Sequence, residues 1–198
     1  MESYWDNQSD VYQYRRSGVL KNLPGIRDKS ILDVFEQRAT ALRLDEVLDE
    51  TRNCPIDLTL WKSIHRILFQ DVYEWAGRVR VVQLAKGTTV FAMPQYIEAE
   101  GKRIFDAFSQ EELAGMNPAQ LTARLAYYFA ELNVLHPFRE GNGRTQKLLF
   151  DEIARRDGYL IEWARIDKGF LLQALISAFQ EQDYKALETL FQAALLNS

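Results

Sequence analysis

Residues 131–150 read ELNVLHPFREGNGRTQKLLF. Apolar residues recur at helical spacing from Pro118 up to this stretch, and the Asn-Pro pair before them is a typical helix start. A second helical pattern follows the stretch and closes with two arginines and Gly158, as helix C-termini often do. Residues 117–158 are therefore predicted to form two buried helices joined by a short polar loop.

The centre of the stretch has the composition of an anion site. Gly141 and Gly143 allow positive φ and let backbone N–H groups approach a ligand closely. They open the second helix, whose unpaired N–H groups and positive dipole end favour an anion. Arg144 and Lys147 are one helical turn apart, so both cations can face the same anion.

Two further side chains indicate what the anion is. Glu140 would repel phosphates unless a divalent cation lies between them, and Mg²⁺ is commonly held by a carboxylate together with phosphate oxygens. His136 is one of only two histidines, and its unperturbed pKa suits proton abstraction near neutral pH. The residues alone therefore predict a nucleotide-phosphate site with a base beside it.

The loop also resembles the motif of the Fic (Fido) family, His-x-Phe-x-(Asp/Glu)-Gly-Asn-Gly-Arg-x-x-Arg. It matches at every defined position except the last, where Lys147 replaces arginine. The earlier segment IHRILFQDVYEWAGRVR is similar to the same family. Because lysine is a point charge and arginine a bidentate fork, the replacement is expected to lower activity modestly, and Lys147→Arg to restore it.

The resemblance implies an all-α fold, the Fic-fold helical bundle with one short β-hairpin flap. Residues 1–198 are expected to form a single Fic domain, with an N-terminal arm over 1–29, the flap over 78–92 and the helix–loop–helix core over 117–158. In relatives the flap holds the target protein beside the active site. Lys86 and Gly87 fall where the flap meets the nucleotide.

The activity that the resemblance implies is protein adenylylation, the transfer of AMP from ATP to a Ser, Thr or Tyr hydroxyl of a target protein. His136 would take the hydroxyl proton, and Glu140 would hold Mg²⁺ against the phosphates. The implied nucleotide-binding residues are Gly141, Asn142, Gly143, Arg144, Lys147, Lys86 and Gly87.

The chain looks most like bacterial Fic toxins of toxin–antitoxin pairs. Many relatives inhibit themselves with a helix carrying (Ser/Thr)-x-x-x-Glu-(Gly/Asn). The stretch from Ser177 to Glu181 is followed by Gln182, which departs from that pattern. The expectation is therefore a separate small antitoxin protein. In that class the targets include the ATPase subunits of type II topoisomerases, DNA gyrase or topoisomerase IV.

Three alternatives to AMP transfer remain. A related branch phosphorylates its target, but it carries lysine where Gly143 stands, so that branch is disfavoured. Other Fic proteins transfer UMP or a phosphocholine group, and the sequence does not separate these donors. A Fic-fold binding module without catalysis is the remaining alternative, which Lys147 keeps open.

Composition narrows the class further. With 198 residues, 47% of them hydrophobic, the chain can bury a core, and its net charge of −4 argues against a general nucleic-acid binder. No apolar run approaches a membrane span, and the N-terminus lacks a signal-peptide core. The single cysteine, Cys54, cannot form an internal disulfide, so the protein is expected in the cytoplasm.

Helical spacing predicts about seven helices: from Asp28 to Leu48, from Asp57 to Gly77, from Pro94, the two motif helices, and two more capped by Asp167 and Asp183. The β-branched run from Val79 to Leu84 and the run from Thr88 to Phe91 predict a hairpin.

The sequence also predicts the surroundings of three further side chains. His65 is expected to be a packed histidine, because its helix neighbours are apolar. Phe138 is expected to point into the core and anchor the loop, and Arg139 to face solvent.

Overall fold

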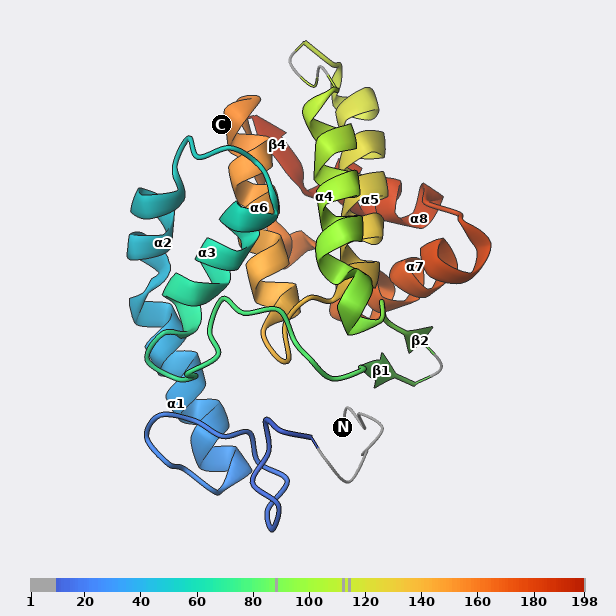
Figure 1. The fold of residues 1–198 in the computed structure, drawn as a ribbon. Helices are drawn as coiled ribbons and strands as arrows, with labels where there is room; N and C mark the ends of the chain where they lie inside the picture. Colours follow the sequence, from blue (N-terminus) through green and yellow to red (C-terminus); the bar gives the residue numbers. More distant parts are fainter. Residues whose placement is uncertain (1–9, 88, 112, 114, 198) are drawn as a thin grey trace.

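Eight α-helices make up most of the part of the chain that the computed structural model describes, residues 10–87, 89–111, 113 and 115–197 (Figure 1). This confirms the predicted all-α class. The helices are α1 (Lys29–Leu42), α2 (Leu44–Thr51), α3 (Leu58–Phe69), α4 (Ile97–Ser109), α5 (Pro118–Leu135), α6 (Asn142–Arg156), α7 (Lys168–Glu181) and α8 (Lys185–Ala194). Two short 3₁₀ turns are η1 (Pro94–Tyr96) and η2 (Trp163–Arg165). None of these helices is long and apolar enough to cross a membrane.

Helix α5 is the centre of the bundle. Asn117 and Gln120 form a capping box at its start, each side chain bonding the other's backbone N–H, and Pro118 is the first helical residue. Its apolar residues, including Leu125 and Phe129, are buried against α4, α6, α7 and α8. The helix therefore fixes where the loop that follows it begins.

Helix α3 supports the same loop from the other side. The Asp57 side chain caps it by accepting the backbone N–H of Leu60, and Trp61 and Ile64 are fully buried. The prediction that this helix runs to Gly77 is wrong, because it ends at Phe69. The chain then turns back so that the residues after α3 approach the motif loop.

The predicted helix from Asp28 to Leu48 is two helices, α1 and α2, with a break at Arg43. Arg43 leaves helical geometry at ψ −3° and its guanidinium pairs with Asp71, beyond α3, at 2.6 Å. Ile31 and Leu42, two apolar residues at helical spacing in α1, are both exposed.

The predicted hairpin is present, but it is shorter than expected. Strands β1 (Ala85–Lys86) and β2 (Thr89–Val90) pair antiparallel, with Lys86 opposite Thr89. Val79–Leu84 forms no strand; the carbonyl of Val82 accepts a hydrogen bond from the Arg80 side chain instead of a ladder bond. Thr88 lies outside the described residues. The hairpin lies at the end of the bundle where α5 leads into α6 (Figure 1).

A second pair of strands was not predicted. Strand β3 (Tyr159–Ile161) pairs antiparallel with β4 (Leu195–Asn197), which ties the segment after α6 to the segment after α8. Strands of three residues give too short an alternation to be recognised in a sequence. The pair closes the bundle at the end away from the hairpin (Figure 1).

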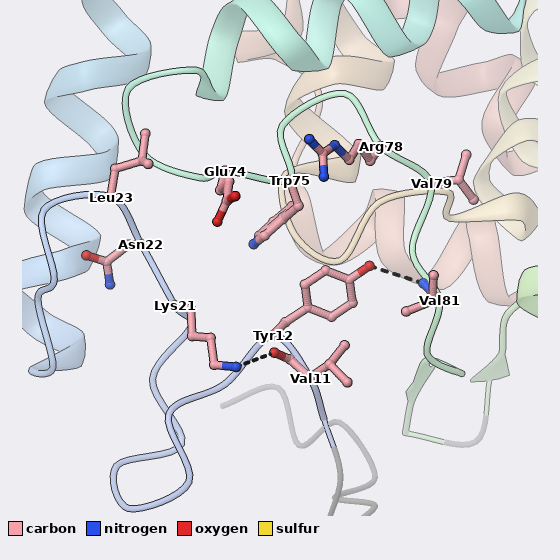
Figure 2. Close-up of a pocket in the computed structure, with 10 residues that line it drawn as sticks. All are labelled: Val11, Tyr12, Lys21, Asn22, Leu23, Glu74, Trp75, Arg78, Val79 and Val81. Carbon is pink, nitrogen blue, oxygen red and sulfur yellow. Dashed lines mark hydrogen bonds between the residues drawn. The ribbon is translucent and has the colours of Figure 1, made fainter.

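The described part of the N-terminal arm packs on the segment that follows α3 (Figure 2). The Tyr12 ring lies edge-on to Trp75, with ring centroids 5.4 Å apart, and the Tyr12 hydroxyl accepts the backbone N–H of Val81 at 3.1 Å. Tyr4 and Trp5, which were also assigned to the arm, lie outside the described residues. The arm therefore covers the chain that leads into the hairpin.

One ion pair joins this arm to the motif loop and corrects a prediction. Arg139 does not face solvent: its side chain is only 2% exposed. Its Nε and Nη2 donate to Asp10 Oδ2 at 2.9 and 2.7 Å. The arm thus supplies the charge partner of this buried arginine, from 129 positions away.

Asp10→Asn should therefore lower the free energy of unfolding by about 3 kcal/mol, because it leaves the Arg139 charge buried without its partner. Urea denaturation measures this directly. The matched control is Asp33→Asn, which breaks the exposed pair with Lys29 and should cost less than about 0.5 kcal/mol. Equal effects of the two substitutions would contradict the structural role of Asp10.

Candidate active site

His136 stands where α5 ends. Its backbone is left-handed, at φ 42° and ψ 60°, which terminates the helix and turns the chain into the motif loop. The ring stacks on Phe91, just after β2, with centroids 3.8 Å apart and planes 16° apart. Nδ1 is buried and has no hydrogen-bond partner within the described part of the chain.

The surroundings of His136 favour its neutral form. Burial lowers its pKa to about 3, and the positive charges of Arg80 and Lys86 act in the same direction. The imidazole is therefore unprotonated at neutral pH, as a general base must be.

Asn142 holds the motif loop closed. Its Oδ1 accepts the backbone N–H of Phe138 at 2.8 Å, and its Nδ2 donates to the Phe138 carbonyl at 2.7 Å. The Phe138 side chain is fully buried between Trp61 and His65, as predicted. The loop therefore has one shape, set by a side-chain clasp and a buried ring.

His65 is a packed histidine, as predicted, and it also positions the loop. Its Nδ1 accepts the backbone N–H of Gly77 at 2.9 Å, so Nε2–H donates to the Glu140 carbonyl at 3.0 Å. Burial lowers its pKa to about 3. Stability from this site is therefore complete above the unfolded-state pKa of about 6.5 and is lost as the pH falls toward 3.

The two motif glycines differ in why the backbone would need a glycine there. Gly141 has φ +80°, and a Cβ there would lie 2.3 Å from the Phe69 ring. Gly143 lies within α6 without a positive φ, so the prediction of positive φ holds only at Gly141. A Cβ on Gly143 would meet nothing within 4 Å, which leaves its backbone open to a ligand.

The first turn of α6 presents unpaired donors. The backbone N–H groups of Asn142, Gly143 and Arg144 precede the first helical hydrogen bond, from Thr145 to Gly141, and have no acceptor among the described residues. These groups and the positive end of the helix dipole favour the binding of an anion. The Asn142 side chain takes no part in this, because both its polar atoms bond Phe138.

Arg144 lies beside this turn and is held by residues that sequence reasoning missed. Its Nη2 donates to Glu36 Oε1 at 2.5 Å, and its guanidinium lies over the Phe69 ring at 4.7 Å. Glu36 is buried on α1 and also accepts the Tyr73 hydroxyl. In the sequence, Glu36 is an ordinary acidic residue of a predicted helix. Nothing there indicates that its partner lies 108 positions away.

Lys147 contacts a different part of the fold. Its Nζ lies 4.9 Å from the centre of the Trp163 ring, in η2, and the negative charge of Asp151 acts on it. Burial lowers the Lys147 pKa. Arg144 reaches α1 and α3 whereas Lys147 reaches η2, so the two cations share no protein contact.

Glu140 is the one motif carboxylate. Its Oε1 accepts the N–H of Gly141 at 2.9 Å and lies 3.9 Å from Arg144 Nη2. The described residues contain no cluster of three or more His, Cys, Asp or Glu side chains that could cage a metal ion. A single carboxylate beside an anion site fits Mg²⁺, which keeps water and phosphate oxygens as its other ligands.

The hairpin brings its predicted residues toward the site. Lys86 in β1 is close enough for its charge to lower the pKa of His136. Gly87 follows with φ +58°, as the turn requires. His136, Glu140, the unpaired N–H groups of α6 and Lys86 are thus grouped around the same loop.

Comparison with known proteins agrees with this geometry. Residues 55–154, half of the chain, match the model of the Fic/DOC family. The chain belongs to the Fic/DOC family. The match includes α3, the hairpin and the whole motif loop.

Several curated relatives from bacteria are similar over most of this chain. The probable protein adenylyltransferase y4lH of Sinorhizobium fredii is 38% identical over 86% of this chain and 88% of its own length. The probable protein adenylyltransferase Fic of Escherichia coli is 36% identical over 92% and 90%. Protein adenylyltransferase VbhT of Bartonella schoenbuchensis is 36% identical over 88% of this chain, which spans only 37% of VbhT.

Solved structures share the fold. The N-terminal Fic domain of a cell filamentation protein from Bartonella quintana, solved with bound ADP, superposes with a TM-score of 0.86 at 26% identity, covering 97% of each chain. BepC from Bartonella tribocorum, solved with AMPPNP, gives 0.84 at 24% identity over 98% of this chain and 100% of that one.

The two glycines offer a matched pair of substitutions. Gly141→Ala should destabilise the fold by about 2 kcal/mol or more, because it combines a positive φ with a clash against Phe69. Gly143→Ala should leave stability within about 1 kcal/mol of wild type, because the space is open and alanine favours helix. Thermal or urea unfolding measures both. A Gly141→Ala protein as stable as Gly143→Ala would show that the loop is not packed as described.

Proposed function

We propose that the protein is a protein adenylyltransferase, which transfers AMP from ATP to a Ser, Thr or Tyr hydroxyl of another protein. The observation that carries the proposal is the pairing of a neutral histidine with a turn of unpaired N–H groups on one short loop. Two curated relatives that align with this chain over most of their own length are named probable protein adenylyltransferases.

In the proposed reaction, His136 takes the proton of the target hydroxyl. Because Nδ1 is buried, Nε2 is the atom that accepts it. The hydroxyl oxygen forms a bond to the α-phosphorus as the bond from that phosphorus to the β-phosphate bridge breaks, and pyrophosphate leaves. The phosphates of bound ATP raise the low pKa of His136 toward the working pH, which improves it as a base.

The phosphates would bind the first turn of α6. The N–H groups of Asn142 and Gly143, together with Arg144, stabilise the charge that develops there. Glu36 occupies Nη2 of Arg144, and the guanidinium has further N–H donors for phosphate oxygens. When bound, Mg²⁺ held by Glu140 would neutralise phosphate charge.

Lys147 would complete the phosphate site only by leaving the Trp163 ring. Its four-carbon stem allows this movement, and the cost is the lost contact with the ring. This gives a physical reason for the expected modest loss of activity relative to arginine at this position.

The target would dock on the hairpin. Strand β2 is an edge that can pair with an extended segment, and four exposed apolar side chains belong to the hairpin or to the residues near it in the sequence. These are Val81, Val90, Met93 and Tyr96. Phe91 on the same hairpin stacks on His136, so a segment bound at the edge lies next to the base.

We also infer a toxin role in the cytoplasm, with a separate antitoxin, as the motif resemblance implies. Glu181 is exposed and bonded to Ser177 on α7 at 3.1 Å, so it does not contact Arg144 in this structure. DNA gyrase or topoisomerase IV is the proposed target.

Expression of the protein alone should arrest bacterial growth, and harmless high-level expression would contradict this role.

His136→Ala should abolish labelling of a target, because it removes the proposed base. It should leave ATP binding intact, because the phosphates would bind the first turn of α6. The measurement uses purified protein, Mg²⁺ and a bacterial lysate with ATP labelled at the α-phosphate. A labelled band that is lost in the variant supports AMP transfer and identifies the target.

ATP labelled at the γ-phosphate is the control, and it should label nothing through this protein. Labelling that persists in His136→Ala would contradict the assigned base. If ATP gives no labelling but UTP or a phosphocholine donor does, the donor is not ATP. Binding of a target without any transfer would indicate a binding module.

A further inference from the structure

Arg80 is a buried arginine with an unusual set of partners. It is 1% exposed and makes no salt bridge to a carboxylate within the described residues. Its side chain donates instead to backbone carbonyls. The contacts are Nε to His136 at 2.7 Å, Nη1 to Val82 at 2.6 Å, and Nη2 to Ala92 at 2.5 Å and to Leu135 at 3.2 Å.

These carbonyls come from three separate segments. Leu135 and His136 end α5, Val82 lies on the way into the hairpin, and Ala92 lies on the way out. The backbone N–H of Arg80 also donates to the Pro137 carbonyl at 2.8 Å. One side chain thus joins both ends of the hairpin to the residue proposed as the base.

A buried charge of this kind is costly for stability alone. The carbonyls and the negative end of the α5 dipole offset part of that cost. An apolar side chain of similar length would fill the space without the desolvation penalty, but it could not bond all four carbonyls. The arginine therefore holds these segments in an arrangement that an apolar residue could not fix.

We propose that Arg80 is a positioning residue for the transfer reaction, holding His136 in its left-handed conformation and fixing the hairpin against the same ring. The reaction itself rests on the function proposed above, whereas the positioning of His136 is a property of the fold. Arg80 touches neither nucleotide nor target in this role; it acts through His136 and through Phe91.

The proposal has an electrostatic consequence. The charged groups that act on His136 are Arg80, before the hairpin, and Lys86, on β1; from α5 the Asn133 carbonyl acts in the opposite direction. Removing the Arg80 charge takes away a cation that opposes protonation, so the pKa of His136 should rise. A lysine at the same position keeps most of this charge but loses the planar fork.

The test compares Arg80→Met, Arg80→Lys and the exposed control Arg78→Met, each checked for folding by circular dichroism. With two histidines in the chain, the imidazole signals can be followed by NMR across pH and assigned with His136→Gln. Arg80→Met should raise the His136 pKa, which burial, the larger cause, still holds below its ordinary value. Arg80→Lys should keep it low but weaken the ring contacts between His136 and Phe91 in the nuclear Overhauser spectrum. Arg78→Met should change neither.

Kinetics provides the second readout. Both Arg80 variants should lower kcat by about 10²-fold, the typical effect of a misplaced catalytic group, with KM for ATP within about twofold of wild type. The proposal would be overturned if Arg80→Lys and Arg80→Met fold and both keep the wild-type kcat, the wild-type His136 titration and the wild-type ring contacts. If Arg80→Met does not fold, Arg80→Lys decides through its kcat and ring contacts. If wild type transfers no AMP, the proposed function fails, and the NMR readouts still decide the role of Arg80.

Discussion

Two hydrogen bonds between the Asn142 side chain and the backbone of Phe138 set the shape on which the site depends. They close the loop between α5 and α6 into a turn tight enough to bury the Phe138 ring. Once the loop is closed, the N–H groups that open α6 have no acceptor among the described residues. They can bond water or a ligand anion, so the constraint that stabilises the loop also creates the candidate anion site.

The sequence predicted this region well because its signals are local. Helix caps at Asn117 and Asp57 and the positive φ of the glycine at the start of α6 each depend on neighbours within a few positions. The hairpin turn at Gly87 is local too. The motif resemblance then added the family, which the matched residues 55–154 confirm.

Contacts between distant residues could not be predicted. Arg139 was expected in solvent, because nothing near it in the sequence shows that Asp10 is its partner. Glu36 meets Arg144, and Arg80 meets four carbonyls, only after α1, α5 and the hairpin have packed. Strands β3 and β4 are short and 34 or more positions apart, so their pairing also arises from the packed bundle. The contacts that support the loop are thus tertiary, although the loop itself is local.

We propose that the first turn of α6 binds the phosphates of ATP beside His136. This can be measured by titrating ¹⁵N-labelled protein with ATP and Mg²⁺. The amide signals of Asn142, Gly143 and Arg144 should shift the most and saturate together with the His136 ring signals. Binding of ATP that leaves these three amides unmoved, or shifts a different part of the fold, would contradict it.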